Sequence, residues 1–269
     1  MLRFSLNISM LLKEVPFLDR FAYAADLGFA AVEYLWPTGV DLDALVKARE
    51  RAGIAVALMN ADAGDISAGD RGFLTDPRKS EYVLRNFKVA LGLARAVGSP
   101  IVHPLVGNAL PGVPREQQLA HVREMEKELA AQARAAGIMT TVEALNSLES
   151  PHYLITTSAQ GLELVRSVGA PNLKFQYDVY HMQRMEGNIV HTLRRNIADI
   201  GHIQIADSPT RNQPGTVELN YRFILGAIEE MGYTGYIGLE YNPRGTSEES
   251  LAWIPRDKRA GCTAADLRL

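Results

Sequence analysis

Hydrophobic and polar positions along the chain alternate between two spacings. Short segments with a period of two, typical of β-strands, are followed by longer segments with the helical period of 3.6 residues. The first pair is residues 3–9, where Phe4, Leu6 and Ile8 alternate with polar neighbours, and residues 17–28. The pattern then recurs, and it predicts further strands over residues 30–36, 54–60, 100–106, 138–145, 172–178, 202–207 and 235–241.

Helices are expected between these strands, and their ends carry typical capping residues. Asp41 is a favourable N-cap and Gly53 a favourable stop for one of them. Thr246 and Glu249 have the spacing of a capping box, which predicts a short helix after the last strand. The other expected helices cover residues 17–28, a segment ending near residue 98, and residues 115–137, 158–168, 188–201 and 218–232.

Eight strand–helix units follow one another in 269 residues, without a linker or a low-complexity segment between them. Such alternation requires parallel strands with right-handed crossovers, and eight units of this length predict a closed (β/α)8 TIM barrel. An open doubly wound sheet is the alternative, but no G-x-G-x-x-G turn follows the first strand. We expect one barrel domain over residues 1–254 and a C-terminal tail on the surface over residues 255–269.

Polar side chains are expected inside the barrel on four consecutive strands. In the segment HIQIAD, the two isoleucines should face the helices, so that Gln204 faces the interior. The same alternation directs Glu143, Asp178 and Glu240 inward, each at the C-terminal end of its strand. Active sites of TIM barrels lie at that end of the strands. The pattern therefore predicts a functional site built from three carboxylates and one amide.

Three buried carboxylates would repel one another, and leaving them unpaired would be costly. A divalent cation bound by Glu143, Asp178, Gln204 and Glu240 would remove that cost. Ligation by oxygen alone favours Mg²⁺ or Mn²⁺ over zinc. A satisfied polar network without a metal is the alternative interpretation.

The overall composition narrows the classes of function. The chain has 28 Lys and Arg residues against 31 Asp and Glu residues, and no basic run, so a nucleic acid is not an expected partner. Cys262 is the single cysteine, which agrees with a cytoplasmic protein. No apolar run is long enough to cross a bilayer, and the N-terminus has the pattern of a strand rather than of a signal peptide. We expect a cytoplasmic enzyme with a small-molecule substrate. The sequence leaves open whether the chain forms a homo-oligomer.

Several segments resemble one known family. They are VEALN (142–146), QYDVYHMQRMEG (176–187), GHIQIADSP (201–209), PGTVELNY (214–221) and GLEYNPRG (238–245). These motifs resemble the hydroxypyruvate isomerase family, a branch of the xylose-isomerase-like TIM barrels that includes 2-oxo-tetronate isomerases. The resemblance implies that Glu143 and Glu240 are an acid–base pair and also metal ligands. Asp178 and Gln204 would complete the metal site.

The resemblance also indicates residues that would contact the substrate, a small hydroxy or oxo acid. His181 and Glu149 match positions that contact substrate oxygens in related sugar epimerases. Arg211 is a candidate for binding a substrate carboxylate. His103 is expected to point inward at the end of the fourth strand, either as a substrate contact or as a packed histidine.

One long loop, over residues 61–76, is expected on the catalytic face after the third strand. It is either a lid or a surface loop, and Arg71 would reach a carboxylate if it is a lid.

The expected reaction interconverts hydroxypyruvate and tartronate semialdehyde (2-hydroxy-3-oxopropanoate) by proton transfer through a metal-stabilised cis-enediolate. The sequence departs from the family pattern at some positions, such as Ala144 after Glu143 and Met59 where the family has a histidine. These departures leave the identity of the substrate undecided. A 2-oxo-tetronate isomerase and a ketose 3-epimerase are the alternatives. A DNA-repair endonuclease on the same barrel would need more inward histidines and a basic face.

Overall fold

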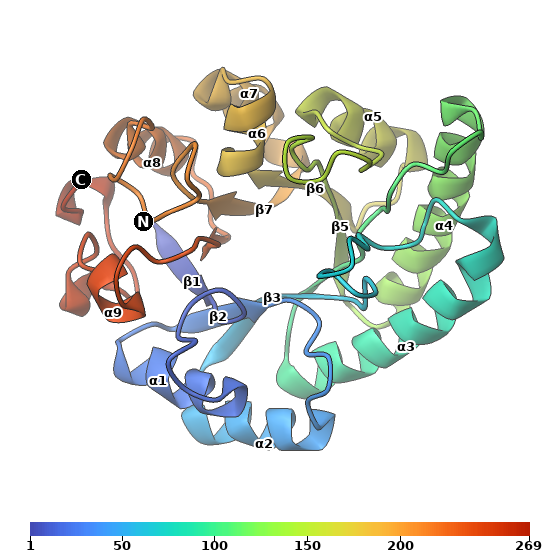
Figure 1. The fold of residues 1–269 in the computed structure, drawn as a ribbon. Coiled ribbons are helices and arrows are strands. Elements are labelled where there is room, and N and C mark those ends of the chain that lie inside the picture. Colours follow the sequence, from blue (N-terminus) through green and yellow to red (C-terminus); the bar gives the residue numbers. More distant parts are fainter.

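Eight parallel strands close into a barrel surrounded by helices in the computed structural model, which describes residues 1–269 (Figure 1). Each strand pairs with the next in sequence, and β8 pairs with β1 in the register Arg3↔Tyr236. The (β/α)8 barrel predicted from the sequence is therefore confirmed. The strands are β1 (Arg3–Asn7), β2 (Ala31–Tyr34), β3 (Ala55–Asn60), β4 (Ile101–His103), β5 (Met139–Glu143), β6 (Leu173–Asp178), β7 (Ile200–Ile205) and β8 (Tyr236–Leu239).

Helices cover the outside of the barrel, and Figure 1 shows them arranged around the ring of strands. Asp41 and the capping box of Thr246 and Glu249 lie at helix starts as predicted. The helices are α1 (Arg20–Asp26), α2 (Leu42–Ala52), α3 (Ser80–Val97), α4 (Arg115–Ala135), α5 (Ser158–Val168), α6 (Val179–Met185), α7 (Ile189–Asn196), α8 (Tyr221–Glu230) and α9 (Ser247–Ser250).

Helix α6 is the element that the sequence pattern did not predict. It begins directly after β6, because the side chain of Asp178 accepts hydrogen bonds from the backbone N–H groups of Tyr180 and His181. An aspartate in this position is a strong N-cap. Asp178 therefore ends a strand and starts a helix, which places His181 one turn above the end of β6.

The apolar side chains of the strands pack against the helices as the period-two pattern predicts. Val142, Phe175, Ile203 and Leu239 are all buried within the main hydrophobic cluster. The ring of Phe175 lies so close to Gly161 of α5 that a Cβ atom there would overlap it. Full burial of such a side chain contributes about 2 kcal/mol, and it ties β6 to the outer helices.

The C-terminal tail packs more closely than its polar composition suggests. Cys262 exchanges backbone hydrogen bonds with Leu2, next to the start of β1. Arg259 is buried and donates to the carbonyl oxygen of Leu27, and Leu267 is also buried. The tail therefore covers the N-terminal ends of β1 and β2, opposite the C-terminal ends of the strands. No helix in the structure has the length and apolar character that a membrane span requires.

Candidate active site

A cavity of about 230 Å³ opens at the C-terminal ends of the strands. Five polar side chains of its wall are Glu143 at the end of β5, Glu240 after β8, and Glu149, His181 and Arg211 from the loops and helix above the barrel. The rest of the wall includes Met10, Leu35, Trp36, Leu105 and Leu145, together with Arg71 from the loop over residues 61–76. A cavity of this size accommodates a substrate of a few carbon atoms.

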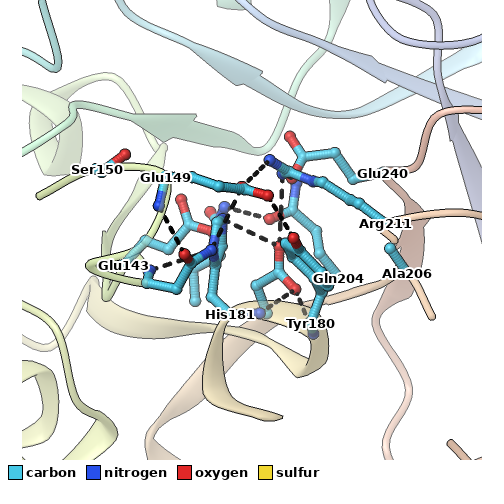
Figure 2. A network of polar contacts seen from close by, with 12 residues as sticks. Glu143, Glu149, Ser150, Tyr180, His181, Gln204, Ala206, Arg211 and Glu240 are labelled. Atoms are coloured by element: carbon cyan, nitrogen blue, oxygen red, sulfur yellow. Dashed lines mark hydrogen bonds and ion pairs between the residues drawn. The ribbon is translucent and has the colours of Figure 1, made fainter. Parts of the chain in front are cut away.

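Glu143, His181 and Glu240 lie close together in this cavity (Figure 2), and Asp178 belongs to the same cluster. One potential ligand atom from each of Glu143, Asp178, His181 and Glu240 lies within 4.8 Å of the others, and all four residues are buried. Glu143 Oε1 and Asp178 Oδ2 have no hydrogen-bond partner in the protein. Buried oxygens without a partner are rare and costly, so this cluster has the oxygen donors and the unsatisfied charge that a divalent cation would bind.

The protonation equilibria of the carboxylates reflect their crowding. Burial raises the pKa of Glu143 well above its ordinary value, and the charge of Asp178 raises it further. Burial also raises the pKa of Asp178 and of Glu240, although the positive charge of Arg211 opposes both shifts. Carboxyl groups with raised pKa values can both accept and return a proton near neutral pH.

Arg211 is the positive charge that the cluster contains. Its Nη2 lies 2.8 Å from Oε2 of Glu240 and 4.0 Å from Oδ2 of Asp178, and its Nη1 lies 3.4 Å from Oε2 of Glu149. The guanidinium also lies over the ring of Tyr180, with 5.1 Å between Cζ and the ring centroid. Arg211 is therefore shared among three carboxylates of the protein.

Asp207, which follows β7 in the chain, fixes the conformation of the loop that carries Arg211 through hydrogen bonds. The buried Asp207 carboxylate accepts hydrogen bonds from the backbone N–H groups of Ser208, Thr216, Val217 and Leu219. Arg211 itself has a φ of 55°, in the left-handed region that costs a non-glycine residue about 1 kcal/mol or more. The hydrogen bonds of Asp207 offset that cost and hold the loop over the cavity.

The hydrogen bonds of His181 determine which of its ring nitrogens faces the cavity. Nδ1 accepts a hydrogen bond from the backbone N–H of Asn146 at 3.2 Å, so it carries no proton. Burial, together with the charges of Arg211 and Arg71, lowers the pKa of His181 well below its ordinary value, so the ring is neutral. The single proton is therefore on Nε2, which lies 3.6 Å from Oδ2 of Asp178. An N–H group in this position can donate to a substrate oxygen.

Gln204 lies beneath the carboxylates, inside the barrel. Its Nε2 donates to Oε1 of Glu33 at 2.8 Å, and its Oε1 accepts from Nε2 of Gln176 at 2.7 Å. A carbonyl oxygen has two lone pairs, so one of them stays free for a second partner. Gln204 is a neutral oxygen donor next to Asp178, its register neighbour on β6.

His103 lies behind Glu143 rather than in the cavity wall, and it is fully buried. Its Nδ1 lies 3.0 Å from both the carbonyl and the hydroxyl oxygen of Thr141, and its Nε2 lies 3.3 Å from Oε2 of Glu143. Burial lowers the pKa of His103 to about 4, so it is neutral at pH 7. Of the two roles expected from the sequence, the geometry favours a packed histidine that supports Glu143.

Glu149 lies at the rim of the cavity, where its position is fixed by hydrogen bonds from Tyr180 Oη and from Asn146 Nδ2. The labelled residues of Figure 2 show how Glu149 and Arg211 reach over the cluster from opposite sides. Glu149, His181 and Arg211 therefore line the same cavity as the carboxylates of Glu143 and Glu240.

Comparison with known proteins shows which family the chain belongs to. Residues 21–256 match the family of xylose isomerase-like TIM barrels. The hydroxypyruvate isomerase of Escherichia coli is 39% identical over 94% of this chain and 98% of its own. The chain belongs to the hydroxypyruvate isomerase family. A 2-oxo-tetronate isomerase of Pectobacterium atrosepticum is 37% identical over 93% of this chain and 96% of its own. Members of this family are isomerases, and the chain is an enzyme of this kind.

A solved structure shares the fold over nearly the whole chain. The crystal structure titled "AP endonuclease, family 2" from Brucella melitensis is 35% identical, covers 94% of this chain and 98% of its own, and has a TM-score of 0.91. The hydroxypyruvate isomerase relative confirms the resemblance that the sequence motifs carried. Several sugar epimerases with about 20% identity share the fold alone.

Two polar residues of the barrel interior were missed by the sequence analysis. Glu33 on β2 is fully buried and accepts hydrogen bonds from Ser5 at 2.7 Å and from Gln204. Asn7 on β1 donates to Glu240 Oε1 at 3.2 Å. The signal was present in both strands, since the alternation that places Val32 and Tyr34 against the helices directs Glu33 inward.

Proposed function

We propose that this enzyme interconverts hydroxypyruvate and tartronate semialdehyde. The reaction moves a carbonyl group from C2 to C3 of a three-carbon acid. A proton leaves C3 and a proton is added to C2, while the hydroxyl proton of O3 is transferred to O2. The observation that carries the proposal is the pair of carboxylates Glu143 and Glu240, which face one small cavity with raised pKa values. The family membership supports the reaction class.

Glu143 and Glu240 would act as base and acid across the plane of an enediolate formed from the substrate. One carboxylate removes the proton from the substrate carbon while the other carboxyl group returns a proton to its neighbour. Asn7 and Arg211 hold Glu240 through its two oxygens, and His103 lies against Glu143. These contacts orient the two groups toward the cavity before the substrate binds.

Glu143, Asp178, Gln204 and Glu240 would bind a divalent cation, Mg²⁺ or Mn²⁺. The buried oxygens without a partner on Glu143 and Asp178 fit this role, and the oxygen donor set fits these two metals. A bound cation would polarise the substrate carbonyl and stabilise the negative charge that develops on its oxygen. The Nε2–H group of His181 and the carboxylate of Glu149 would hydrogen bond to the remaining substrate oxygens.

Solvent deuterium exchange tests this proposal. The wild-type protein should incorporate deuterium from D₂O into hydroxypyruvate, and the substitutions Glu143→Gln and Glu240→Gln should each reduce the rate by about 100-fold or more. Glu163→Gln, at an exposed position of α5, is the matched control and should leave the rate unchanged. Exchange at the wild-type rate in both active-site variants would overturn the assignment of the acid–base pair.

A 2-oxo-tetronate isomerase is the second candidate, because relatives of that name have nearly the same identity to this chain as the hydroxypyruvate isomerase. The same acid–base chemistry would serve both substrates. Parallel assays with hydroxypyruvate and a 2-oxo-tetronate distinguish the two by their values of kcat/KM.

A further inference from the structure

Arg71 is a guanidinium group in the cavity wall that the proposed chemistry does not use. Its Nε donates to the hydroxyl oxygen of Ser150 at 3.2 Å, and its Nη1 donates to the carbonyl oxygens of Ile66 at 3.0 Å and Asp70 at 2.7 Å. All three acceptors are neutral, and Nη2 has no hydrogen-bond partner in the protein. Arg71 thus has a fixed orientation and a free pair of donors.

The charge environment of Arg71 differs from that of Arg211. Arg211 forms ion pairs with Glu149 and Glu240 and lies 4.0 Å from Asp178, so its charge is shared within the protein. Arg71 forms no ion pair, although it is half-buried. A partly desolvated guanidinium without an anion is costly unless an anion binds to it, and planar carboxylates match its paired donors.

The loop that carries Arg71 is fixed to the neighbouring loop after β4. Gly72 donates its backbone N–H to Ala63, and Phe73 forms a β-bridge with Gly107. Asn108 Nδ2 donates to the carbonyl oxygen of Gly69 at 2.9 Å. A Cβ atom at Gly72 would overlap the carbonyl group of Leu105, so only glycine permits this close approach. Arg71 is therefore held at the cavity before any ligand binds.

We propose that Arg71 binds the carboxylate group of the substrate and thereby restricts the site to small acids. This inference rests on the proposed function, because it assumes that Glu143 and Glu240 act on the carbon atoms next to that carboxylate. Ser150 is the positioning residue, since it accepts the hydrogen bond of Nε and lines the same cavity as Arg71. Arg211, which the sequence analysis considered for this task, is engaged by Glu149 and Glu240 and would act on the catalytic carboxylates instead.

Direct binding of glycerate tests the proposal without turnover. Glycerate has the carboxylate and hydroxyl groups of the substrate but no carbonyl group, so it is not isomerised. In calorimetric titrations with Mg²⁺ present, Arg71→Met should raise the Kd for glycerate by about 10- to 100-fold, the range expected for a lost hydrogen-bonded charge contact. Arg71→Lys should retain part of the affinity. Arg95→Met, at an exposed position of α3, is the matched control and should bind as the wild type does.

Kinetics give a second readout. Arg71→Met should lower kcat/KM for hydroxypyruvate mainly through KM, while any activity on the neutral analogue dihydroxyacetone stays within about threefold of wild type, because that analogue lacks the charge. Wild-type affinity for glycerate in Arg71→Met would overturn the proposal. So would a loss of glycerate binding that is accompanied by a lower melting temperature in both Arg71→Met and Arg71→Lys, since that result indicates a structural role.

The two proposals fail in different ways. If the wild-type protein does not turn over hydroxypyruvate but binds glycerate in a manner that depends on Arg71, the proposed reaction is wrong and the acid-binding role of Arg71 holds. If turnover depends on Glu143 and Glu240 while Arg71→Met binds glycerate normally, the reaction holds and the role of Arg71 is wrong.

Discussion

The side-chain amide of Gln204 donates a hydrogen bond of 2.8 Å to Oε1 of Glu33 inside the barrel. This contact is the last in a series of hydrogen bonds, and each side chain of the series donates to the next one, from Thr141 to Glu33. The Thr141 hydroxyl donates to Gln176 Oε1 at 3.0 Å, and Gln176 Nε2 donates to Gln204 Oε1 at 2.7 Å. The other oxygen of Glu33 lies 2.9 Å from Nε2 of His202. Glu33 therefore fixes which end of the Gln204 amide faces the carboxylate cluster.

Substitution of Glu33 should lower metal affinity and activity, although Glu33 itself does not line the substrate cavity. Glu33→Gln removes the carboxylate oxygen that lies 2.9 Å from Nε2 of His202 and allows the Gln204 amide to rotate. We expect metal affinity and kcat to fall by about 10- to 100-fold, the usual effect of losing a group that orients a ligand. The free energy of unfolding should fall by about 2 kcal/mol, because buried hydrogen bonds to a carboxylate are lost. Mn²⁺ titration and urea unfolding measure the two effects, and unchanged values of both would contradict the prediction.

Gly238 gives an independent test of the space that Glu33 occupies. A Cβ atom at Gly238 on β8 would overlap both carboxylate oxygens of Glu33. Gly238→Ala alone should therefore destabilise the protein by about 2 kcal/mol through overpacking. In the Glu33→Ala background the same substitution should cost little, because the carboxylate is gone. Urea unfolding of the four proteins gives the coupling energy, and purely additive effects would rule out the steric account.

The sequence predicted the fold and the inward position of three carboxylates because both depend on strictly local patterns. Period-two alternation was sufficient to direct Glu143, Asp178 and Glu240 inward, and their order along the chain brought them to one end of a closed barrel. Helix α6 was not predicted because Asp178 was interpreted only as the end of a strand, although it also caps a helix. The same alternation would have found Glu33 if it had been applied to β2.

Other features depend on contacts between distant segments, which a local pattern does not contain. The tautomer of His181 follows from the backbone N–H of Asn146, and the free charge of Arg71 follows from the neutral partner Ser150. The buried Arg259 of the tail is likewise stabilised by the carbonyl oxygen of Leu27. Such groups are identified only when the surrounding elements are in place.

Asp207 should control both stability and activity through the loop that carries Arg211. Asp207→Asn replaces one carboxylate oxygen with an NH₂ group that would oppose two of the four backbone N–H donors. We expect a loss of about 2 to 4 kcal/mol in the free energy of unfolding and a lower kcat/KM, because Arg211 loses its position. Asp266→Asn, in the capping box of Thr263 at a short helix in the tail, should cost about 1 kcal/mol or less. Equal effects of the two substitutions would contradict this role for Asp207.

A divalent cation should stabilise the protein through the carboxylate cluster. Addition of Mg²⁺ or Mn²⁺ to chelator-treated protein should raise the melting temperature in a concentration-dependent manner, because the ion binds only the folded state. Asp178→Asn should abolish most of this increase, since it removes charge from a buried oxygen that has no other partner. Glu163→Gln should leave it unchanged. An identical metal response in wild type and Asp178→Asn would exclude Asp178 as a ligand.

Glu126 is buried on the inner face of α4. Neither of its carboxylate oxygens has a hydrogen-bond partner. Burial raises the pKa of Glu126 from 4.5 to about 8, so the folded protein holds this group in its neutral form at pH 7. Below the unfolded pKa the group is protonated in both states, and its contribution to stability is fully present. As the pH rises toward about 8, the unfolded chain ionises first and this contribution is lost.

Glu126→Gln keeps the shape of the side chain but removes the titration. The stability of wild type relative to this variant should therefore fall by a few kcal/mol between about pH 5 and about pH 8.5, at about 1.4 kcal/mol per unit of pKa difference. Urea unfolding at both pH values measures the change, and Glu163→Gln, which is exposed, should show none. Parallel stability curves for wild type and Glu126→Gln would mean that Glu126 is ionised in the folded protein and paired with a group that compensates its charge.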